Sequence, residues 1–272
     1  MDRTDADDSH GGTQQPAPQK AVRKVKGPLP AFPTITVILL FTCVLLHLVP
    51  DLAMNSNAGN VTYMIDGDTT DSDIRANRHA IMGANNDQLL ADGQYWRLVT
   101  ATFLHLGMPH VWINCMFLLF LGRRIEPVYG WGWFLGAYIV AGVVGNLLSW
   151  KCMGFPFIQA GASGSIFGLL GIGLVHYGRQ MRQDVSAFFL KLLLGGIVFL
   201  VLGFVQEGAD NLGHVGGLAT GAILAVVMPA ERVNQPRYRN AAIAVGVATA
   251  VTVLGCFVLA TLKGLEYLEM FP

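Results

Sequence analysis

Residues 163–178 read SGSIFGLLGIGLVHYG, an apolar run that begins with a serine and is interrupted repeatedly by glycine. In a soluble helix each interior glycine costs about 1 kcal/mol relative to alanine. In a membrane, small residues instead allow two helices to approach closely. The run therefore predicts a membrane helix that packs tightly against a neighbouring helix.

The rest of the chain has the same character. Hydrophobic residues make up 53% of the 272 residues and charged residues only 13%, against roughly 25% charged in typical soluble domains. The mean hydropathy is +0.47. The apolar runs are continuous rather than alternating, so they predict helices and not the strands of a barrel. The further runs lie at 34–49, 109–122, 131–150, 187–204, 212–228 and 240–262.

The order of these runs predicts an all-α polytopic membrane protein. Residues 1–27 are polar and are expected to form a disordered cytoplasmic tail. Residues 28–230 would form a six-helix core with a long outer loop at 50–107, and residues 231–272 would add a seventh transmembrane helix. A cleaved signal peptide is disfavoured for the first run, because a long tail precedes it and no clean cleavage site follows.

Basic residues predict the orientation, because cytoplasmic loops are enriched in Lys and Arg. With the N-terminus in the cytoplasm, the cytoplasmic segments hold Arg3, Lys20, Arg23, Lys24, Lys26, Arg123, Arg124, Arg179, Arg182, Arg232, Arg237 and Arg239. The opposite side holds only Arg75, Arg78, Arg97, Lys151 and Lys263. We therefore expect the C-terminus outside. A basic tail without a transit peptide fits a bacterial inner membrane better than an organelle, so we expect the former.

Four polar residues begin helices that enter the membrane from the outer side. His110 and Asn114 lie at the start of the second run, Ser163 at the start of the fourth and His214 at the start of the sixth. Each alone has an ordinary structural explanation, such as close packing for Ser163 or a bond between helices for His110 and Asn114. Together, at similar depth, they provide the groups that acyl transfer requires.

The expected chemistry follows from these groups. A serine hydroxyl is a weak nucleophile, so a base such as His214 must take the proton of Ser163. The resulting oxyanion needs donors, which His110, Asn114 and the Ser163 amide could supply. Gly161 would let the backbone and a substrate approach closely. No acidic residue is expected beside His214 itself. Glu207 and Asp210 lie only in the adjacent loop, which favours a two-residue dyad over a triad.

Glycines at helical spacing predict that the fourth and sixth runs touch. Gly164 and Gly168 share one face of the fourth, and Gly213, Gly217 and Gly221 share one face of the sixth. Such small-xxx-small patterns are typical of close helix pairs in membranes. Contact between these faces would bring Ser163 and His214 together.

Several classes of site are disfavoured by composition. The cysteines Cys43, Cys115, Cys152 and Cys256 are scattered and form no CxxC pair, which argues against a zinc site or a disulfide framework. The formal net charge is zero, so no nucleic-acid partner is indicated. We expect no cofactor and no metal.

In combination these motifs resemble the rhomboid family of intramembrane serine proteases. The resemblance covers roughly residues 80–230. The matching features are Trp96-Arg97, His110-x-x-x-Asn114, Glu126, Gly161-x-Ser163-Gly164 and His214-x-x-Gly217-x-x-x-Gly221.

The resemblance implies a six-helix core around a water-filled cavity that opens to the outside. It implies a dyad of Ser163 and His214, and an oxyanion hole of His110, Asn114 and the Ser163 amide. The substrates would be transmembrane segments of other proteins, cut near their outer end, with lipid surrounding the enzyme. The fifth helix and the loop at 206–211 would form the side from which substrates approach.

The resemblance also assigns supporting residues. Trp96 and Arg97 would anchor the outer loop at the membrane interface, and Glu126 would be structural at the inner end of the second helix. Phe167 departs from the tyrosine of some members, yet it would keep an aromatic ring stacked on His214.

Two other functions remain to be weighed. A rhomboid-like protein could bind membrane segments without cutting them, but such relatives generally lack the serine or the histidine. A transporter or channel would place ionisable residues at mid-membrane, and no inverted repeat is visible here. The sequence does not identify the substrate, the cleavage site, the oligomeric state or the role of residues 50–80.

Overall fold

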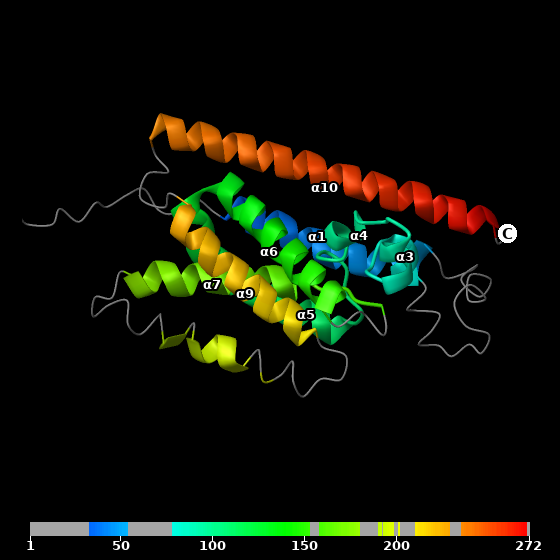
Figure 1. Cartoon of the computed structure of the whole chain (residues 1–272), viewed down its shortest axis with the longest axis horizontal. Helices are drawn as coiled ribbons and strands as arrows, with labels where there is room; N and C mark the ends of the chain where they lie inside the picture. Colours follow the sequence, from blue (N-terminus) through cyan, green and yellow to red (C-terminus); the bar gives the residue numbers. More distant parts are fainter. Residues whose placement is uncertain are drawn as a thin grey trace, which may run out of the picture. The chain divides into compact units, whose positions relative to one another are not determined.

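The computed structural model describes residues 33–53, 78–152, 158–179, 190–191, 193–198, 201, 210–228 and 235–270. These residues belong to one compact unit, Ala31–Pro272. Their regular structure is helical, and strand-like pairing within them is a single bridge between Asn85 and Gln159. The helices, shown in Figure 1, are α1 (Thr34–Ala53), α3 (Asp87–Ala91), α4 (Arg97–Thr100), α5 (Met108–Tyr129), α6 (Trp131–Cys152), α7 (Ser163–Arg179), α9 (Asn211–Val227) and α10 (Pro236–Met270).

Each apolar run in the described part of the chain forms a helix, but two helices are longer than expected. α5 continues past the predicted end at residue 122 to Tyr129, through Glu126 and Pro127. It ends at Gly130, whose φ of 79° suits glycine. α10 runs from Pro236 to Met270, well beyond the predicted 240–262. Charged residues marked the ends of these apolar runs, although they did not end the helices.

Glu126 explains why α5 extends so far. Its carboxylate accepts hydrogen bonds from the backbone N–H groups of Ile35 and Thr36, at 2.9 and 2.8 Å, and from the Thr36 hydroxyl at 2.7 Å. The first N–H groups of a helix have no partner within the helix, and a negative charge there is favourable. The last turns of α5 therefore cap α1.

The glycine seam between α7 and α9 is the closest helix contact near the site. We use "α7–α9 seam" for Gly164 and Gly168 of α7 with Gly217 and Gly221 of α9. A Cβ at Gly217 would collide with the Gly164 carbonyl, and one at Gly221 with the Gly168 carbonyl. The two helices make the most extensive contact of any pair in the described structure, and they lie side by side in Figure 1. The predicted contact is confirmed.

The second half of the expected outer loop is a packed structure rather than a loose polar segment. We call residues 78–107 the 78–107 loop; it contains α3 and α4. Ala84, Leu90, Leu104 and the side chain of Arg97 have no exposed surface. Within the predicted 50–107 segment, residues 78–107 are thus compact, because short apolar stretches here are buried.

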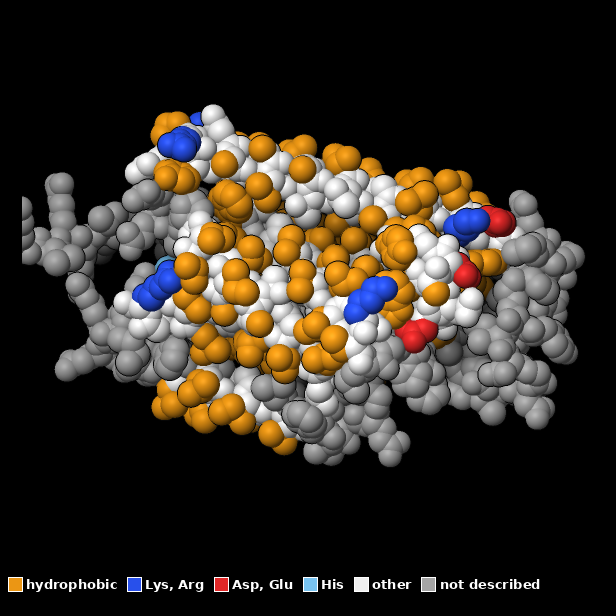
Figure 2. Space-filling model, viewed as in Figure 1, with side chains coloured by type: hydrophobic (Ala, Val, Ile, Leu, Met, Phe, Trp, Pro, Cys, Tyr) orange, Lys and Arg blue, Asp and Glu red, His pale blue; other side chains and the backbone are white. Residues whose placement is uncertain are grey.

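Exposed apolar surface is extensive. Two helices, Trp131–Cys152 and Pro236–Tyr267, are long and apolar enough to cross a membrane, while Thr34–Leu48 and Asn211–Val227 are apolar but shorter. Along α10, hydrophobic side chains cover the middle of the helix and charged groups gather at its two ends (Figure 2). Such a surface is typical of a helix surrounded by lipid.

Some expectations concern parts of the chain outside the described residues. These are the tail at 1–27, most of the segment at 50–80, and most of the fifth run at 187–204 with the loop that follows it. Within the fifth run, residues 190–191, 193–198 and 201 are helical.

Candidate active site

Ser163 and His214, 51 residues apart in the chain, meet at the first turns of α7 and α9. The Ser163 Oγ lies 2.8 Å from the Nε2 of His214, and the pair is partly buried. The ring of Phe167, one turn along α7, stacks on the imidazole with centroids 4.6 Å apart and an interplanar angle of 25°. The seam and this stacking hold the imidazole against the serine hydroxyl.

Asp210 shapes the start of the helix that carries His214. Its carboxylate accepts a hydrogen bond from the backbone N–H of Gly213 at 2.7 Å and one from the Ser149 hydroxyl at 2.5 Å. An aspartate at this position caps the helix and satisfies one of its free N–H groups. Asp210 therefore ties the beginning of α9 to α6. Glu207 lies outside the described residues.

The segment before Ser163 is held by backbone bonds from the 78–107 loop. Asn85 and Gln159 exchange two N–H···O bonds, at 2.8 and 2.9 Å, and the N–H of Gly161 donates to the Ala101 carbonyl at 2.9 Å. α7 then begins at Ser163, so the amide of Ser163 belongs to the first turn and has no partner within the helix. Such an amide, with the helix dipole behind it, can bind a developing negative charge.

His110 and Asn114 lie in the first two turns of α5. A Cβ at Gly161 would be 2.9 Å from Cε1 and 3.0 Å from Nε2 of His110, so only glycine lets this imidazole lie against the backbone that leads to Ser163. The buried Asn114 side chain donates to the His110 carbonyl at 3.0 Å. Because an amide group has two N–H donors, one remains for another acceptor.

His105 is a site residue that the sequence analysis missed. Its Nδ1 lies 3.2 Å from the Phe103 carbonyl, and its Nε2 accepts from the N–H of Ala162 at 3.5 Å. Burial, with a smaller effect from neighbouring His110, lowers the pKa of His105 to about 3. The ring is therefore neutral at pH 7 and can accept this bond. A signal was present, since His105 comes five residues before His110.

Two further histidines converge on the same place. The Nδ1 of His47, from α1, and the Nε2 of His79 lie 3.0 and 2.9 Å from the carbonyl oxygen of His105. These bonds fix the chain just before α5, which carries His110.

Arg97 lies inside the 78–107 loop, and its guanidinium is fully buried there. The expectation that Trp96 and Arg97 anchor this loop at a membrane interface stays a prediction. It donates to the Gln94 Oε1 at 2.9 and 2.8 Å and to the carbonyls of Ala80 and Ala84 at 2.5 and 2.9 Å. The half-buried ring of Trp96 lies 4.5 Å from it. Burial of Arg97 is favourable because its planar guanidinium donates hydrogen bonds to backbone carbonyl groups that the compact loop removes from water.

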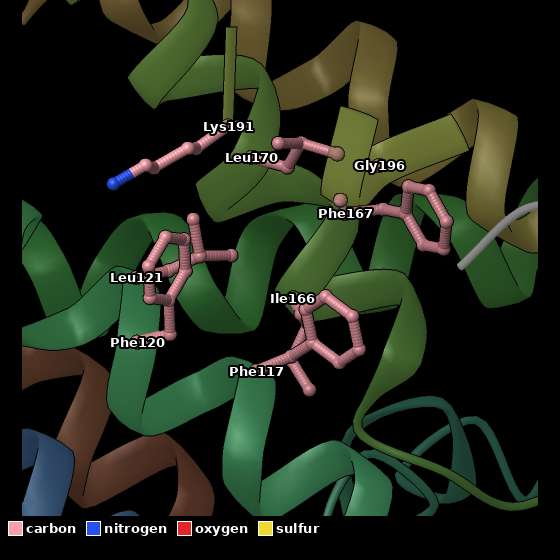
Figure 3. A pocket seen from close by; sticks show the side chains of 9 residues that line it. Phe117, Phe120, Leu121, Ile166, Phe167, Leu170, Lys191 and Gly196 are labelled. Atoms are coloured by element: carbon pink, nitrogen blue, oxygen red, sulfur yellow. The ribbon is translucent and has the colours of Figure 1, made fainter. Parts of the chain in front are cut away.

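A small apolar pocket lies next to Phe167, between α5, α7 and the helical residues 193–198. Phe167, the ring that stacks on His214, is part of its wall, and Lys191 lies at one edge (Figure 3). The remaining lining residues come from α5, α7 and the helical residues 193–198: Phe117, Phe120, Leu121, Ile166, Leu170, Gly195 and Gly196.

Comparison with known proteins identifies the family. A rhomboid domain model matches residues 92–231, just over half of the chain. The chain is 36% identical to rhomboid protease GluP of Bacillus subtilis over 146 aligned residues. The alignment covers 54% of this chain and 28% of that protein. The chain is 33% identical over 187 residues to rhomboid-like protease 1 of Toxoplasma gondii, covering 64% and 61%, and 30% identical over 174 residues to rhomboid-type serine protease 2 of Emericella nidulans, covering 61% and 34%. The chain thus spans less than two thirds of each of these relatives, but the domain match is sufficient: this chain belongs to the rhomboid family.

Proposed function

We propose that the protein is an intramembrane serine endopeptidase that cleaves transmembrane segments of other membrane proteins. The observation that carries this proposal is the 2.8 Å contact between Ser163 Oγ and His214 Nε2, with Phe167 stacked on the imidazole. A nucleophile within hydrogen-bond reach of an oriented base is the arrangement that acyl transfer needs. The relatives named as proteases support the same activity.

The proposed reaction has two stages. His214 takes the proton of the Ser163 hydroxyl as the oxygen attacks the scissile carbonyl, and it then gives that proton to the leaving amine. A water molecule repeats the sequence in the second stage: it loses a proton to His214, attacks the acyl-enzyme and releases Ser163. In each stage a negative oxygen develops that needs fixed donors.

The oxyanion would be bound by three groups. These are the amide of Ser163 at the start of α7, the second N–H of the Asn114 side chain, and the imidazole of His110. Gly161 supports this assignment because the His110 ring lies against the backbone there. Donors that are already in place lower the barrier because they need no reorganisation during the reaction.

The substrate would approach on the side where α5, α7 and residues 193–198 line the small apolar pocket. The pocket is too small to hold a transmembrane helix, but its apolar lining suits contact with one, and it reaches Phe167 beside the dyad. We place the N-terminus in the cytoplasm and the C-terminus outside, in a bacterial inner membrane, so that cleavage occurs near the outer face. A protein that only binds membrane segments has no need of an assembled dyad, so the contact favours the protease.

The test compares wild-type protein with Ser163→Ala in liposomes that contain a substrate with a helix-destabilised transmembrane segment. Products are identified by mass spectrometry. We expect the wild type to cut near one membrane boundary and Ser163→Ala to be inactive. Ser165→Ala is the matched control, because it removes a neighbouring hydroxyl without touching the dyad, and it should still cut. Equal cleavage by wild type and Ser163→Ala would refute the proposal.

A further inference from the structure

The long helix α10 is in contact with two separate parts of the described structure. Its first half packs on α6, where a Cβ at Gly132 would collide with the Ala242 carbonyl. Its second half reaches the 78–107 loop: the ring of Phe257 lies 5.5 Å from that of Phe103, edge to face. Further along, a Cβ at Gly264 would lie 3.2 Å from the Ile81 side chain. The end of α10 is therefore fitted to the loop, not only to α6.

Polar bonds continue this contact into the loop. The Nε2 of Gln94 donates to the hydroxyl of Tyr267, in the last turns of α10, at 2.9 Å. The Oε1 of the same Gln94 accepts two bonds from Arg97, and Arg97 in turn donates to the carbonyls of Ala80 and Ala84. The Tyr267 hydroxyl therefore accepts a hydrogen bond from the side-chain amide of Gln94, and the amide oxygen of Gln94 is directed at Arg97.

The guanidinium depends on this oxygen. Arg97 is fully buried, its hydrogen bonds go to neutral acceptors (Gln94 Oε1 and two backbone carbonyls), and the Tyr267 side chain lies close enough to favour its charge directly. Burial lowers the pKa of Arg97 to about 10, so it remains charged at pH 7 in surroundings that disfavour charge. Losing one acceptor from such a group is costly. The orientation of Gln94 therefore determines how firmly Arg97 holds Ala80 and Ala84.

The loop that Arg97 holds is bonded to the chain just before the candidate nucleophile. Ala84 is followed by Asn85, which exchanges two backbone bonds with Gln159. Gly161, two residues later, donates to the carbonyl of Ala101, one residue beyond α4. A continuous series of hydrogen bonds, joined by short stretches of chain, thus connects the end of α10 with the segment that leads into α7.

We propose that Tyr267 is a positioning residue for the active site: through Gln94 and Arg97 it holds the 78–107 loop, and through the loop the segment 159–162 that sets the Ser163 amide. This inference rests on the proposed function for its catalytic consequence, but the mechanical link stands without it. It assigns to α10, which lies outside the matched rhomboid domain, a part in building the site.

The test uses the full chain in detergent and compares wild type, Tyr267→Phe, Gln94→Glu and the double variant. Hydrogen exchange by mass spectrometry is read for 78–105 and 158–163, and the rate at which a fluorophosphonate labels Ser163 is read in parallel. Tyr267→Phe keeps the ring and loses only the hydroxyl. We expect faster hydrogen exchange in both segments and slower labelling of Ser163. The labelling rate should fall by roughly three- to tenfold, which corresponds to the free energy of one hydrogen bond.

The double variant supplies a readout that a purely structural role would not give. A glutamate at position 94 pairs with Arg97 directly and no longer needs Tyr267 to orient it. We therefore expect Gln94→Glu to restore both exchange and labelling in the Tyr267→Phe background. Failure of this rescue, or wild-type exchange in Tyr267→Phe, overturns the proposal. So does an equal rise of exchange throughout the chain, since Tyr267 would then serve only general stability.

A second pair of variants tests the same contact by packing. Gly264→Leu pushes against Ile81, whereas Gly255→Leu adds the same side chain to α10 where nothing lies within 4 Å of a Cβ. We expect faster exchange at 158–163 only in Gly264→Leu. If wild-type protein is never labelled at Ser163, the proposed function fails, and the exchange comparison still decides whether α10 holds the loop.

Discussion

The α7–α9 seam and the 78–107 loop both end at Ser163, and they hold it by different means. In the seam, the backbones of the two helices are in direct contact. Positions 217 and 221 are glycine, and a Cβ at either would collide with a carbonyl group of α7. In the loop, the contacts are hydrogen bonds, from the Asn85–Gln159 pair to the bond between Gly161 and Ala101. One region sets the distance between two helices, and the other sets the position of a short irregular segment.

This difference assigns separate tasks to the two regions. The seam determines whether His214 can reach Ser163, because each of these residues lies in the first turn of one of the two helices. The loop holds the backbone just before α7, and in the proposed mechanism it therefore sets whether a developing oxyanion would meet its donors. Damage to the seam should separate the dyad, whereas damage to the loop should leave the dyad in place and weaken catalysis only in part.

The largest effect is expected for Gly217→Val. The new side chain would collide with the Gly164 backbone, which cannot move aside as a side chain could. We expect about 3 kcal/mol less stability and a loss of Ser163 labelling of about a hundredfold or more, because the base is displaced. Thermal unfolding and labelling rates check this. Gly255→Val, on the open face of α10, is the control, and an unaffected Gly217→Val would show that the seam does not set the dyad.

A smaller effect is expected for Arg97→Lys in the loop. Lysine keeps the charge, but it lacks the planar guanidinium that donates hydrogen bonds to Gln94, Ala80 and Ala84 at once. We expect about 2 kcal/mol less stability and roughly tenfold slower labelling, with the His214 dependence of labelling retained. A loss as complete as that of Gly217→Val would contradict the division of tasks between the two regions.

The third effect concerns pH, and it is the smallest at neutral pH because it appears only as the pH falls below 6.5. The pKa of His105 is about 3 in the folded protein and 6.5 in the ordinary state. Between these values the unfolded chain binds more protons, so stability is full above pH 6.5 and falls as the pH is lowered towards 3, by up to about 1.4 kcal/mol per pH unit. In His105→Gln this contribution should vanish and the slope of stability against pH should be shallower. Identical slopes would mean that His105 is not buried as a neutral ring.

The two regions also differ in how well the sequence predicts them. Gly164, Gly168, Gly217 and Gly221 recur at helical spacing, and this periodicity was enough to predict the seam and the meeting of Ser163 with His214. Periodicity carries no comparable information about the loop. Arg97 reads as a surface residue by type, and only the folded loop shows that it serves buried carbonyl groups.

His105 and Tyr267 illustrate the same limit. The role of His105 depends on a bond to Ala162, 57 residues away, and that of Tyr267 on Gln94, 173 residues away. No local pattern marks such pairs. The extension of α5 to Tyr129 was missed for a related reason, since Glu126 looks like a helix boundary until its bonds to α1 are seen.

The most direct measurement is the covalent labelling of Ser163 by a fluorophosphonate, located by mass spectrometry, in wild type and in His214→Ala. A dyad predicts that the wild type is labelled at Ser163 and that labelling is abolished in His214→Ala, with both proteins folded by circular dichroism. If the wild type is unlabelled, or if His214→Ala is labelled at the same rate, then His214 does not activate Ser163 and the proposed protease mechanism is wrong.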